Sequence, residues 1–388
     1  RGRLMFLDVL VRRNPAFVSA AISLQQEGAI PAAAYVLDLD AVEHNAGLIA
    51  AEAARLHLDV FAMTKQVGRH PGFIAAVRRG GIDAGVAVDM ECVRALRAGG
   101  MRMGHVGHLV QVPRHDAAEA AAAAPDNWTV FDHAKAGEAA AASVAAGREQ
   151  AILARLVASG DTFYHGHEGG FVDVDPVAVA DVIDELKGAR FGGITTFPAL
   201  LYDHDRRAIA PTPNLGTLER AAERLRAAGR SDVRLNAPGT TSAGALAMLA
   251  AAGATQVEPG HGLTGTTPLH AVRDEPELPA ALYISEISHH HGGRAYCYGG
   301  GFYIDPVFPP YPVQALVARD GDLASAVRVG ADLPPPAMID YYGMLDQPAG
   351  VTLAPGSSAV FGFRIQAFFA RAPVVGVRGV ASGSPGVA

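Results

Sequence analysis

The residues from His57 to Thr64, His-Leu-Asp-Val-Phe-Ala-Met-Thr, predict a buried β-strand, because a short apolar run stands between polar positions. Outward from it, residues 33 to about 270 alternate similar runs with Ala-rich stretches that predict helices. The other predicted strands are Ala34–Asp38, Gly85–Val88, His105–Val110, Trp128–Phe131, Ile152–Val157, Phe191–Thr196, Val233–Asn236 and Thr255–Glu258. Strands that alternate with helices indicate parallel βαβ units, and about eight such units favour a (β/α)8 TIM-like barrel. A doubly wound parallel sheet is the competing arrangement.

The sequence changes in character after about residue 275. Helical patterns end, Gly, Pro and aromatic residues become frequent, and alternating runs such as Ala281–Ile287 and Ser358–Arg364 predict strands. We therefore expect an α/β protein in which the barrel is followed by a mostly β C-terminal domain. The predicted domains are an N-terminal segment that packs on the β domain (1–32), the barrel (33–272) and the C-terminal β domain (273–388).

The composition excludes several classes of function. Hydrophobic residues make up 49% of the 388 residues and charged residues 18%, which excludes a disordered chain. The formal net charge is −7 and Lys and Arg form no long run, so nucleic acid and membrane surfaces are not expected partners. No apolar stretch of the sequence reaches the roughly 18 residues of a membrane span. Two cysteines are too few for a disulfide framework, so we expect a cytoplasmic protein.

Lysine is scarce in this sequence, and its scarcity makes each lysine informative. Only Lys65, Lys135 and Lys187 occur among the 32 basic residues. Lys135 begins a predicted helix, and Lys187 lies in the last turn of another, where the helix dipole favours a cation. Lys65 directly follows the strand His57–Thr64, where partial burial lowers the pKa of an amine and suits it to form an imine. The alternative is a solvated lysine at the rim of the barrel.

Two glycine-containing loops follow the last two predicted strands. The first is Asn236-Ala237-Pro238-Gly239-Thr240-Thr241-Ser242, which opens a helix, and the second is Glu258-Pro259-Gly260-His261. Backbone N–H groups and hydroxyls in such loops can bind a phosphate, and the last two strands carry the usual phosphate site of a barrel. Each loop taken alone could also be an ordinary tight turn. Together they predict a phosphate site.

These features together resemble the alanine racemase N-terminal-domain family, which comprises the fold-type III pyridoxal-phosphate enzymes. The resemblance is carried by Tyr35-Val36-Leu37-Asp38-Leu39-Asp40, Asn45, Lys65, Glu91, Leu96-Arg97-Ala98-Gly99 and Glu258-Pro259-Gly260-His261. It covers about residues 33 to 270, and within the family the sequence is most similar to the YhfX-like, racemase-like branch. The resemblance implies pyridoxal 5'-phosphate as the cofactor and Lys65 as the residue that binds it covalently.

The same resemblance implies further cofactor-binding residues. The phosphate would be bound by Gly239, Thr241, Ser242, Gly260 and His261. Glu258 falls where the family places the partner of the pyridine nitrogen. Alanine racemases proper have Arg there, whereas the related basic-amino-acid decarboxylases have Glu. A carboxylate keeps this nitrogen protonated and makes the ring a stronger electron sink, so the departure puts alanine in doubt as the substrate.

Two tyrosines and a histidine run complete the candidate site. The Cys297-Tyr298-Gly299-Gly300-Gly301 stretch is similar to the loop that carries the second base of the racemases, which makes Tyr298 the candidate base. Tyr341 resembles the family's late tyrosine that contacts the phosphate. Ordinary aromatic roles in a turn or an interface are the alternatives for both. Three histidines, His289 to His291, are consecutive in the sequence. Consecutive side chains of a strand point to alternate faces, so these three cannot all bind one metal ion, and no metal is expected.

The predicted function is that of a dimeric pyridoxal-phosphate enzyme that acts at Cα of an amino acid, with racemisation as the reaction. Lys65 would act on one face of the substrate and Tyr298 of the partner subunit on the other, because a single base returns its proton to the face it left. A decarboxylase or lyase is the first alternative, favoured by Glu258, and a non-catalytic vitamin carrier or regulatory protein is the second. The loop with Arg206 and Arg207 could bind a carboxylate or face water.

Overall fold

Residues 5–304 and 311–388 are described by the computed structural model, and they divide into two units. One unit, here called the barrel unit, consists of Gly47–Thr64 and Val77–Gly260. The other, here called the β unit, consists of Arg1–Ala46, Lys65–Ala76 and His261–Ala388. Among the helices that are described, none is long and apolar enough to cross a membrane.

The barrel unit is built on a parallel sheet. Its strands, in their order across the sheet, are β3 (Ala62–Met63), β4 (Ala84–Ala87), β5 (Arg102–Val106), β6 (Asn127–Val130), β7 (Gln150–Val157), β9 (Ala189–Thr195), β12 (Arg234–Asn236), β13 (Gln256–Val257) and β2 (Asp59–Val60). Only Phe61 separates β2 from β3, so these are two halves of one strand and the pairing returns to its start. The predicted barrel is thereby confirmed, and the doubly wound sheet was wrong. A short strand, β8 (Phe171–Val172), pairs with β7 outside this ring.

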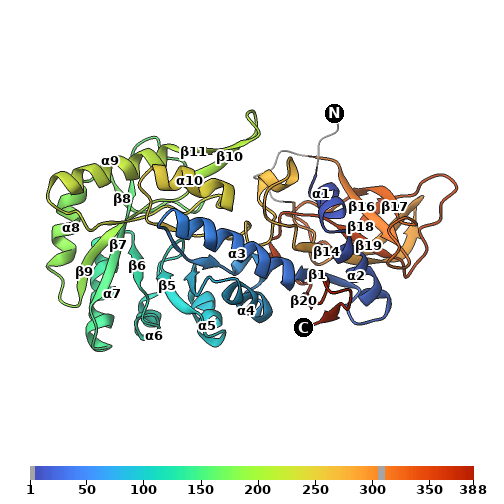
Figure 1. Ribbon diagram of the computed structural model, residues 1–388, viewed down its shortest axis with the longest axis horizontal. Coiled ribbons are helices and arrows are strands. Elements are labelled where there is room, and N and C mark those ends of the chain that lie inside the picture. Colours follow the sequence, from blue (N-terminus) through green and yellow to red (C-terminus); the bar gives the residue numbers. More distant parts are fainter. Residues whose placement is uncertain (1–4, 305–310) are drawn as a thin grey trace. The chain divides into compact units, whose positions relative to one another are not determined.

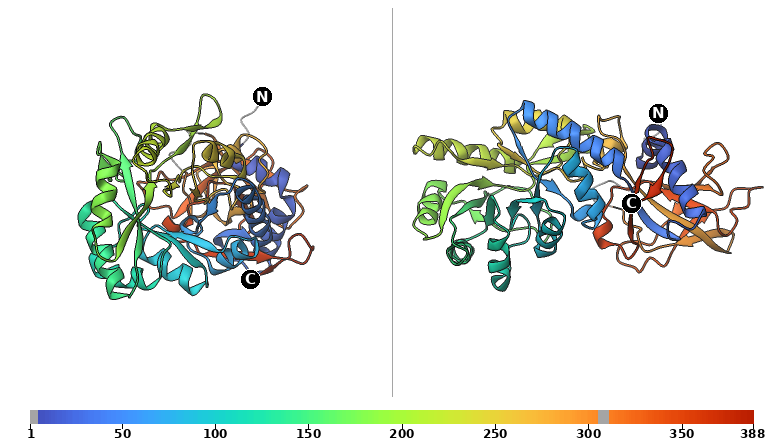
Figure 2. Two further views of the ribbon diagram at one scale, coloured as in Figure 1. Left: turned by 60° about the vertical axis from the view of Figure 1, so that its left-hand side comes forward. Right: turned by 60° about the horizontal axis from the view of Figure 1, so that its bottom comes forward.

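Helices alternate with these strands along the chain. They are α3 (Leu39–Arg55), α4 (Pro71–Arg79), α5 (Met90–Ala98), α6 (Ala117–Ala122), α7 (His133–Ala145), α8 (Pro176–Asp184), α9 (Pro213–Ala227) and α10 (Ala243–Ala251). Figures 1 and 2 show α5 to α10 around the outside of the parallel strands. Local sequence fixes several helix starts: the Asp89 carboxylate accepts from Cys92 N–H at 2.8 Å, and the Asp132 carboxylate accepts from Lys135 N–H at 2.8 Å.

The barrel strands are buried on both faces, which explains their continuous apolar sequences. Every residue of β7 is buried. Polar side chains that are nevertheless buried in these strands are therefore exceptional. They are His105 in β5, Asn127 and Thr129 in β6, Gln150 and Arg155 in β7, Thr195 in β9, Asn236 in β12 and Gln256 in β13.

The β unit contains a nine-stranded, mostly antiparallel sheet. The strands are, in order, β15 (Arg294–Tyr298), β18 (Tyr342–Asp346), β17 (Val327–Asp332), β16 (Val313–Ala318), β19 (Ser358–Phe361), β14 (Ala281–His291), β1 (Ala33–Asp38), β20 (Val374–Arg378) and β21 (Gly386–Val387). The strand Ala34–Asp38, predicted as the first of the barrel, thus lies in this sheet, antiparallel to β14 and parallel to β20. An apolar run buried on both faces does not reveal which strands will pair with it.

Two N-terminal helices, α1 (Phe6–Arg13) and α2 (Pro15–Gln26), also belong to the β unit. Figure 1 shows them beside β1 and β14. Phe17 and Ile22 of α2 are fully buried in one cluster with Val36 of β1 and Ile284 of β14. The N-terminal helices therefore form part of the hydrophobic core on one face of this sheet.

Candidate functional site

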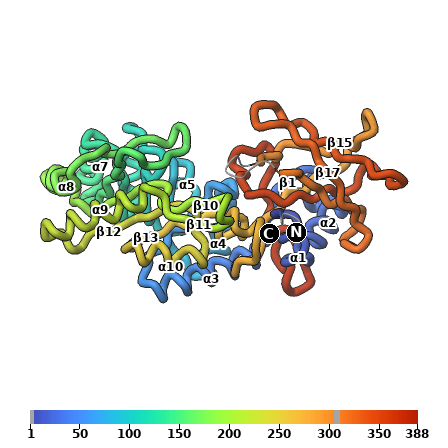
Figure 3. The backbone as a smooth tube through the Cα atoms, turned by 90° about the horizontal axis from the view of Figure 1, so that it is seen from above, coloured from blue at the N-terminus to red at the C-terminus, as the bar shows by residue number. Residues whose placement is uncertain are grey.

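The residues proposed from the sequence fall in both units. Gly239, Thr241, Ser242, Glu258 and Gly260 belong to the barrel unit, whereas Lys65, His261, Tyr298 and Tyr341 belong to the β unit. In Figure 3, β12 and β13 lie beside α10, and the two glycine loops follow these two strands in the chain.

Glu258 directly follows β13, and its side chain is fully buried. Its Oε1 lies 2.5 Å from Nδ1 of His105 and accepts a hydrogen bond from Nδ2 of Asn236 at 2.9 Å. Its Oε2 accepts no hydrogen bond from any residue that the structure describes, and Nε2 of His108 lies 3.4 Å away. Oε1 thus accepts two hydrogen bonds, whereas Oε2 has only the ion pair with His108 and can still accept a hydrogen bond.

The surroundings keep Glu258 ionised. Burial by itself would raise the pKa of this carboxyl group. The charges of His108 and His105 and the hydrogen bonds from His105 and Asn236 outweigh burial and lower the pKa to about 2. An ionised carboxylate can only accept hydrogen bonds, so Nδ1–H of His105 is the donor in the contact with Oε1.

A buried arginine lies in the same unit. Arg155 of β7 is 1% exposed, and its guanidinium lies 4.8 Å from the ring centre of Phe131 and 5.7 Å from that of Phe163. Nη2 donates to the carbonyl of His167 at 2.8 Å and, more weakly, to that of Phe197 at 3.4 Å. Within residues 5–304 and 311–388, Nε and Nη1 have no hydrogen-bond partner. Two unsatisfied donors on a buried cation are costly unless an anion joins them.

Burial lowers the pKa of the Arg155 guanidinium to about 10, an effect that the carboxylate of Glu168 opposes. The group is therefore still charged at neutral pH. Glu168 itself is exposed. Arg155 therefore provides a buried positive charge in the barrel unit.

The predicted phosphate loop after β12 ends at the start of α10. Ser242 is the N-cap residue of α10, is fully buried and makes no cap hydrogen bond with its side chain. In the part of the chain that the structure describes, its Oγ has no partner. A Cβ at Gly239 would stand 2.7 Å from the backbone nitrogen of Leu200, so this turn requires glycine. An unpartnered hydroxyl at a helix N-terminus fits a phosphate group.

One set of residues has metal-ligand geometry. Ligand atoms of His105, His108 and Glu258 lie within 4.8 Å of one another, and all three residues are buried. However, Nδ1 of His105 donates to Glu258, and its Nε2 lies 2.6 Å from Oγ1 of Thr129. Because both ring nitrogens of His105 are engaged, the arrangement favours a hydrogen-bonded support for the carboxylate over a metal centre.

Lys65 begins a 3-10 turn, η1 (Lys65–Val67), directly after Thr64, which ends a stretch of the barrel unit. Its Nζ lies 5.5 Å from the ring centre of Phe368 in η4 (Ala367–Phe369). Nε2–H of His261 donates to the carbonyl of Ile365 at 2.8 Å. Burial and the positive charge of Arg364 hold the pKa of His261 well below its usual range, and the charge of Lys65 adds to this effect. His261 is therefore a neutral imidazole near the lysine.

Tyr298 is the last residue of β15 and is half-buried. Its carbonyl accepts from Ser285 Oγ at 2.7 Å, and its ring centre lies 5.8 Å from that of Tyr342. The following glycine loop is held by Asp340, whose Oδ2 accepts from Gly300 N–H at 2.8 Å. An aspartate from another segment of the chain thus holds this glycine loop.

Three other candidates are exposed. Tyr341 is 65% exposed, and the guanidinium of Arg371 lies 5.8 Å from its ring centre. His289, His290 and His291 are exposed at the end of β14, with the ring of His289 stacked on Tyr296 at 4.8 Å. Arg206 and Arg207 are exposed in the turn between β10 (Leu200–Asp203) and β11 (Ala208–Pro211).

Sequence reasoning did not single out His105, His108 and Arg155 as site residues. Each lay within a predicted apolar strand, and a lone charged or polar residue inside such a run was the signal that could have found them. The predicted strand His105–Val110 also ends earlier, at Val106, because Gly107 has a φ of +75° and turns the chain.

Comparison with known proteins assigns the family. Residues 37–268 match the family "Alanine racemase, N-terminal domain", and residues 282–387 match the family "YhfX-like, C-terminal domain". The chain therefore belongs to the alanine racemase N-terminal-domain family of fold-type III pyridoxal-phosphate enzymes, which confirms the resemblance found in the sequence. It is 40% identical to the protein YhfX of Escherichia coli (strain K12) over 383 residues, which are 98% of this chain and 96% of YhfX.

Solved structures share the fold at lower identity. D-threo-3-hydroxyaspartate dehydratase from Delftia sp. HT23 is 19% identical with a TM-score of 0.68, over 92% of this chain and 97% of that chain. D-threonine aldolase from Filomicrobium marinum is 18% identical with a TM-score of 0.65, over 90% and 92%. Alanine racemase from Corynebacterium glutamicum is 15% identical with a TM-score of 0.63, over 90% and 99%. At these identities the likeness shows the fold alone.

Proposed function

We propose that this protein binds pyridoxal phosphate and racemises an amino acid. The observation that carries the proposal is a set of buried side chains of the barrel unit, each with a polar atom left without a hydrogen bond among the described residues: Glu258, Arg155 and Ser242. Glu258 and Ser242 follow the last two strands of a parallel barrel, at the carboxyl ends where barrel active sites form. Together they offer an acceptor, a cation and a hydroxyl.

Each group fits one part of the cofactor or substrate. Pyridoxal phosphate supplies an electron sink for the pair of electrons left at Cα when a bond to that atom breaks. Glu258 Oε2 would accept the N–H of the pyridine ring and keep that nitrogen protonated. The hydroxyl of Ser242 and the loops around Gly239 and Gly260 would bind the phosphate, and Lys65 would hold the cofactor through its amine.

Arg155 supports an anionic substrate group. Its Nε and Nη1 have no hydrogen-bond partner among the described residues, and both are donors on a cation. We propose that these donors bind the carboxylate of the amino acid, in place of the exposed Arg206 and Arg207.

Racemisation needs proton transfer on both faces of Cα. Lys65 moves the proton on one face, and Tyr298 of the partner subunit moves it on the other. This part of the proposal requires a homodimer with its sites at the interface, and we further propose that the enzyme acts in the cytoplasm.

The test uses single amino-acid enantiomers in D2O. We expect deuterium to enter at Cα while optical activity is lost. Release of CO2, ammonia or an aldehyde without deuterated enantiomer would exclude racemisation. Borohydride reduction followed by peptide mapping tests the cofactor assignment separately: the label is expected at Lys65 and absent from Lys65→Ala.

A lyase is the second candidate function. Glu258 favours it, because a protonated ring supports cleavage of bonds other than Cα–H. The fold neighbours named D-threonine aldolase and D-threo-3-hydroxyaspartate dehydratase are consistent with this reaction class. The same incubations decide between the two, because a 3-hydroxy amino acid would then yield an aldehyde or a keto acid.

A further inference from the structure

We propose that His105, supported by Thr129, is a positioning residue that orients the Glu258 carboxylate toward the cofactor. This inference rests on the proposed function. The role concerns which oxygen of Glu258 is left for the ligand. It involves no contact between His105 and the substrate.

Glu258 can turn about its side-chain bonds, and its orientation therefore needs a cause. Both hydrogen bonds that it receives, from His105 at 2.5 Å and from Asn236 at 2.9 Å, reach Oε1. They come from β5 and β12, which are distant in the sequence. Two donors on one oxygen fix the carboxylate plane and leave Oε2, which forms an ion pair with Nε2 of His108 at 3.4 Å, without a hydrogen bond from the described residues.

Each donor is in turn held by a threonine. Nε2 of His105 lies 2.6 Å from Oγ1 of Thr129, and Oγ1 of Thr195 donates to Oδ1 of Asn236 at 2.7 Å. All of these side chains are at most 1% exposed, so water does not compete for their hydrogen bonds. The threonine contacts select the ring and amide orientations that point N–H groups at Glu258.

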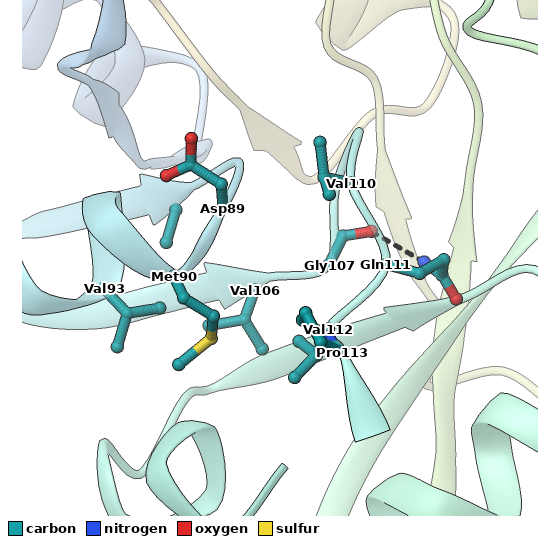
Figure 4. Close-up of a pocket in the computed structure, with 10 residues that line it drawn as sticks. Asp89, Met90, Val93, Val106, Gly107, Val110, Gln111, Val112 and Pro113 are labelled. Carbon is teal, nitrogen blue, oxygen red and sulfur yellow. Dashed lines mark hydrogen bonds between the residues drawn. The ribbon is translucent and has the colours of Figure 1, made fainter. Parts of the chain in front are cut away.

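The segment around Thr129 is itself fixed by Gln111. Nε2 of Gln111 donates to the carbonyls of Gly107 at 3.0 Å and Thr129 at 3.1 Å, and its Oε1 accepts from Phe131 N–H at 3.0 Å. Figure 4 shows Gln111 turned back onto the Gly107 carbonyl, beside a pocket lined mostly by apolar side chains. A Cβ at Gly107 would stand 2.5 Å from the Thr129 carbonyl, so only glycine allows this approach.

The test compares variants of the holoenzyme that break this series of hydrogen bonds at different points. His105→Gln removes the donor at the position of Nδ1, and Thr129→Val removes the hydroxyl that holds the ring. His105→Asn places an amide N–H near the position of Nδ1 and keeps the donor to Glu258. His115→Gln, at an exposed histidine of the same unit, is the matched control.

We expect kcat of His105→Gln to fall about 10- to 100-fold with little change in KM, because one charged hydrogen bond is lost. The 15N signal of labelled pyridoxal phosphate should move toward the value of an unprotonated pyridine. Thr129→Val should move both readouts in the same direction, and His105→Asn should recover part of each. The two positions probe the same contacts independently, so loss of folding in one variant leaves the other as the test.

Three results would overturn the proposal. If Lys65 is labelled by borohydride while both His105→Gln and Thr129→Val keep the wild-type 15N signal and kcat, the positioning role alone is wrong. If wild-type protein with pyridoxal phosphate gives no label at Lys65, the proposed function fails and this inference with it. If the purified protein holds one zinc ion per chain that His105→Gln loses, His105 is a metal ligand.

Discussion

The ionised state of Glu258 can be tested through stability, without any assay of activity. Its pKa in the folded protein lies at about 2, below the ordinary value of 4.5, because His108, His105 and Asn236 outweigh the effect of burial. A carboxyl group with a lowered folded pKa stabilises the protein above its unfolded pKa. This stabilisation is lost as the pH falls from 4.5 toward 2. Glu258→Gln removes the titrating group and nearly preserves the shape of the side chain.

The two pKa values set the size of the effect. They correspond to about 3 kcal/mol of stabilisation at pH 7 and about 1.4 kcal/mol at pH 3. The difference in unfolding free energy between wild type and Glu258→Gln should therefore shrink by about 2 kcal/mol between these two pH values. The other carboxyl groups titrate in both proteins and cancel in this comparison.

Urea denaturation with the cofactor removed measures this difference. The chain has a single tryptophan, Trp128 in β6, which is buried in the same unit as Glu258 and reports its unfolding. Glu223→Gln, on the exposed side of α9, is the control for the same chemical change and should show no comparable pH dependence. If the difference in unfolding free energy between wild type and Glu258→Gln is the same at pH 7 and pH 3, the reasoning is refuted.

Further outcomes follow from the other unsatisfied groups. Arg155→Met should raise KM about tenfold or more. The unfolding free energy without ligand should change by less than about 1 kcal/mol, because removing the unsatisfied donors offsets the loss of the hydrogen bonds. A loss of stability above about 3 kcal/mol would instead indicate that the Arg155 charge is paired within the folded protein. Ser242→Ala should weaken pyridoxal-phosphate binding about 5- to 10-fold and leave the unfolding free energy almost unchanged. Asp132→Ala removes the N-cap hydrogen bond to Lys135 N–H and should lower the unfolding free energy by about 1 kcal/mol. Equal losses of unfolding free energy in urea denaturation of the two variants would contradict this. Gly107→Ala should destabilise the barrel by more than about 1 kcal/mol, since its Cβ would meet the carbonyl of Thr129; unchanged urea denaturation would show that the turn can relax.

Two charged side chains of the candidate site are buried in the barrel unit, and they differ in how far their hydrogen-bonding groups are satisfied. Glu258 is buried but receives two hydrogen bonds on one oxygen, and Arg155 is buried with two donors unused. The unused donors of Arg155 lower stability unless an anion completes them. These two groups support the proposal that the barrel unit binds a ligand with a proton donor and an anionic group.

Much of the architecture could be predicted from the sequence because it depends on local patterns. The runs from β2 to β13 are apolar on both faces, which is typical of strands covered by helices, and the separation between them fits one helix each. The positions of Glu258, directly after β13, and of Lys65, two residues after the end of β3, could be predicted for the same reason. The N-terminal helix α2 escaped prediction because it is apolar on most of its faces and shows no clear helical period.

The sequence by itself determined which residues stand at strand ends and which family the chain belongs to. The tertiary structure decided which residues meet. Strand β1 joined β14 rather than the parallel strands, and Glu258 received its donors from His105 and Asn236, which precede it by 153 and 22 positions. Pairing and hydrogen bonding between distant segments depend on the register of the closed sheet, and no local pattern encodes this register.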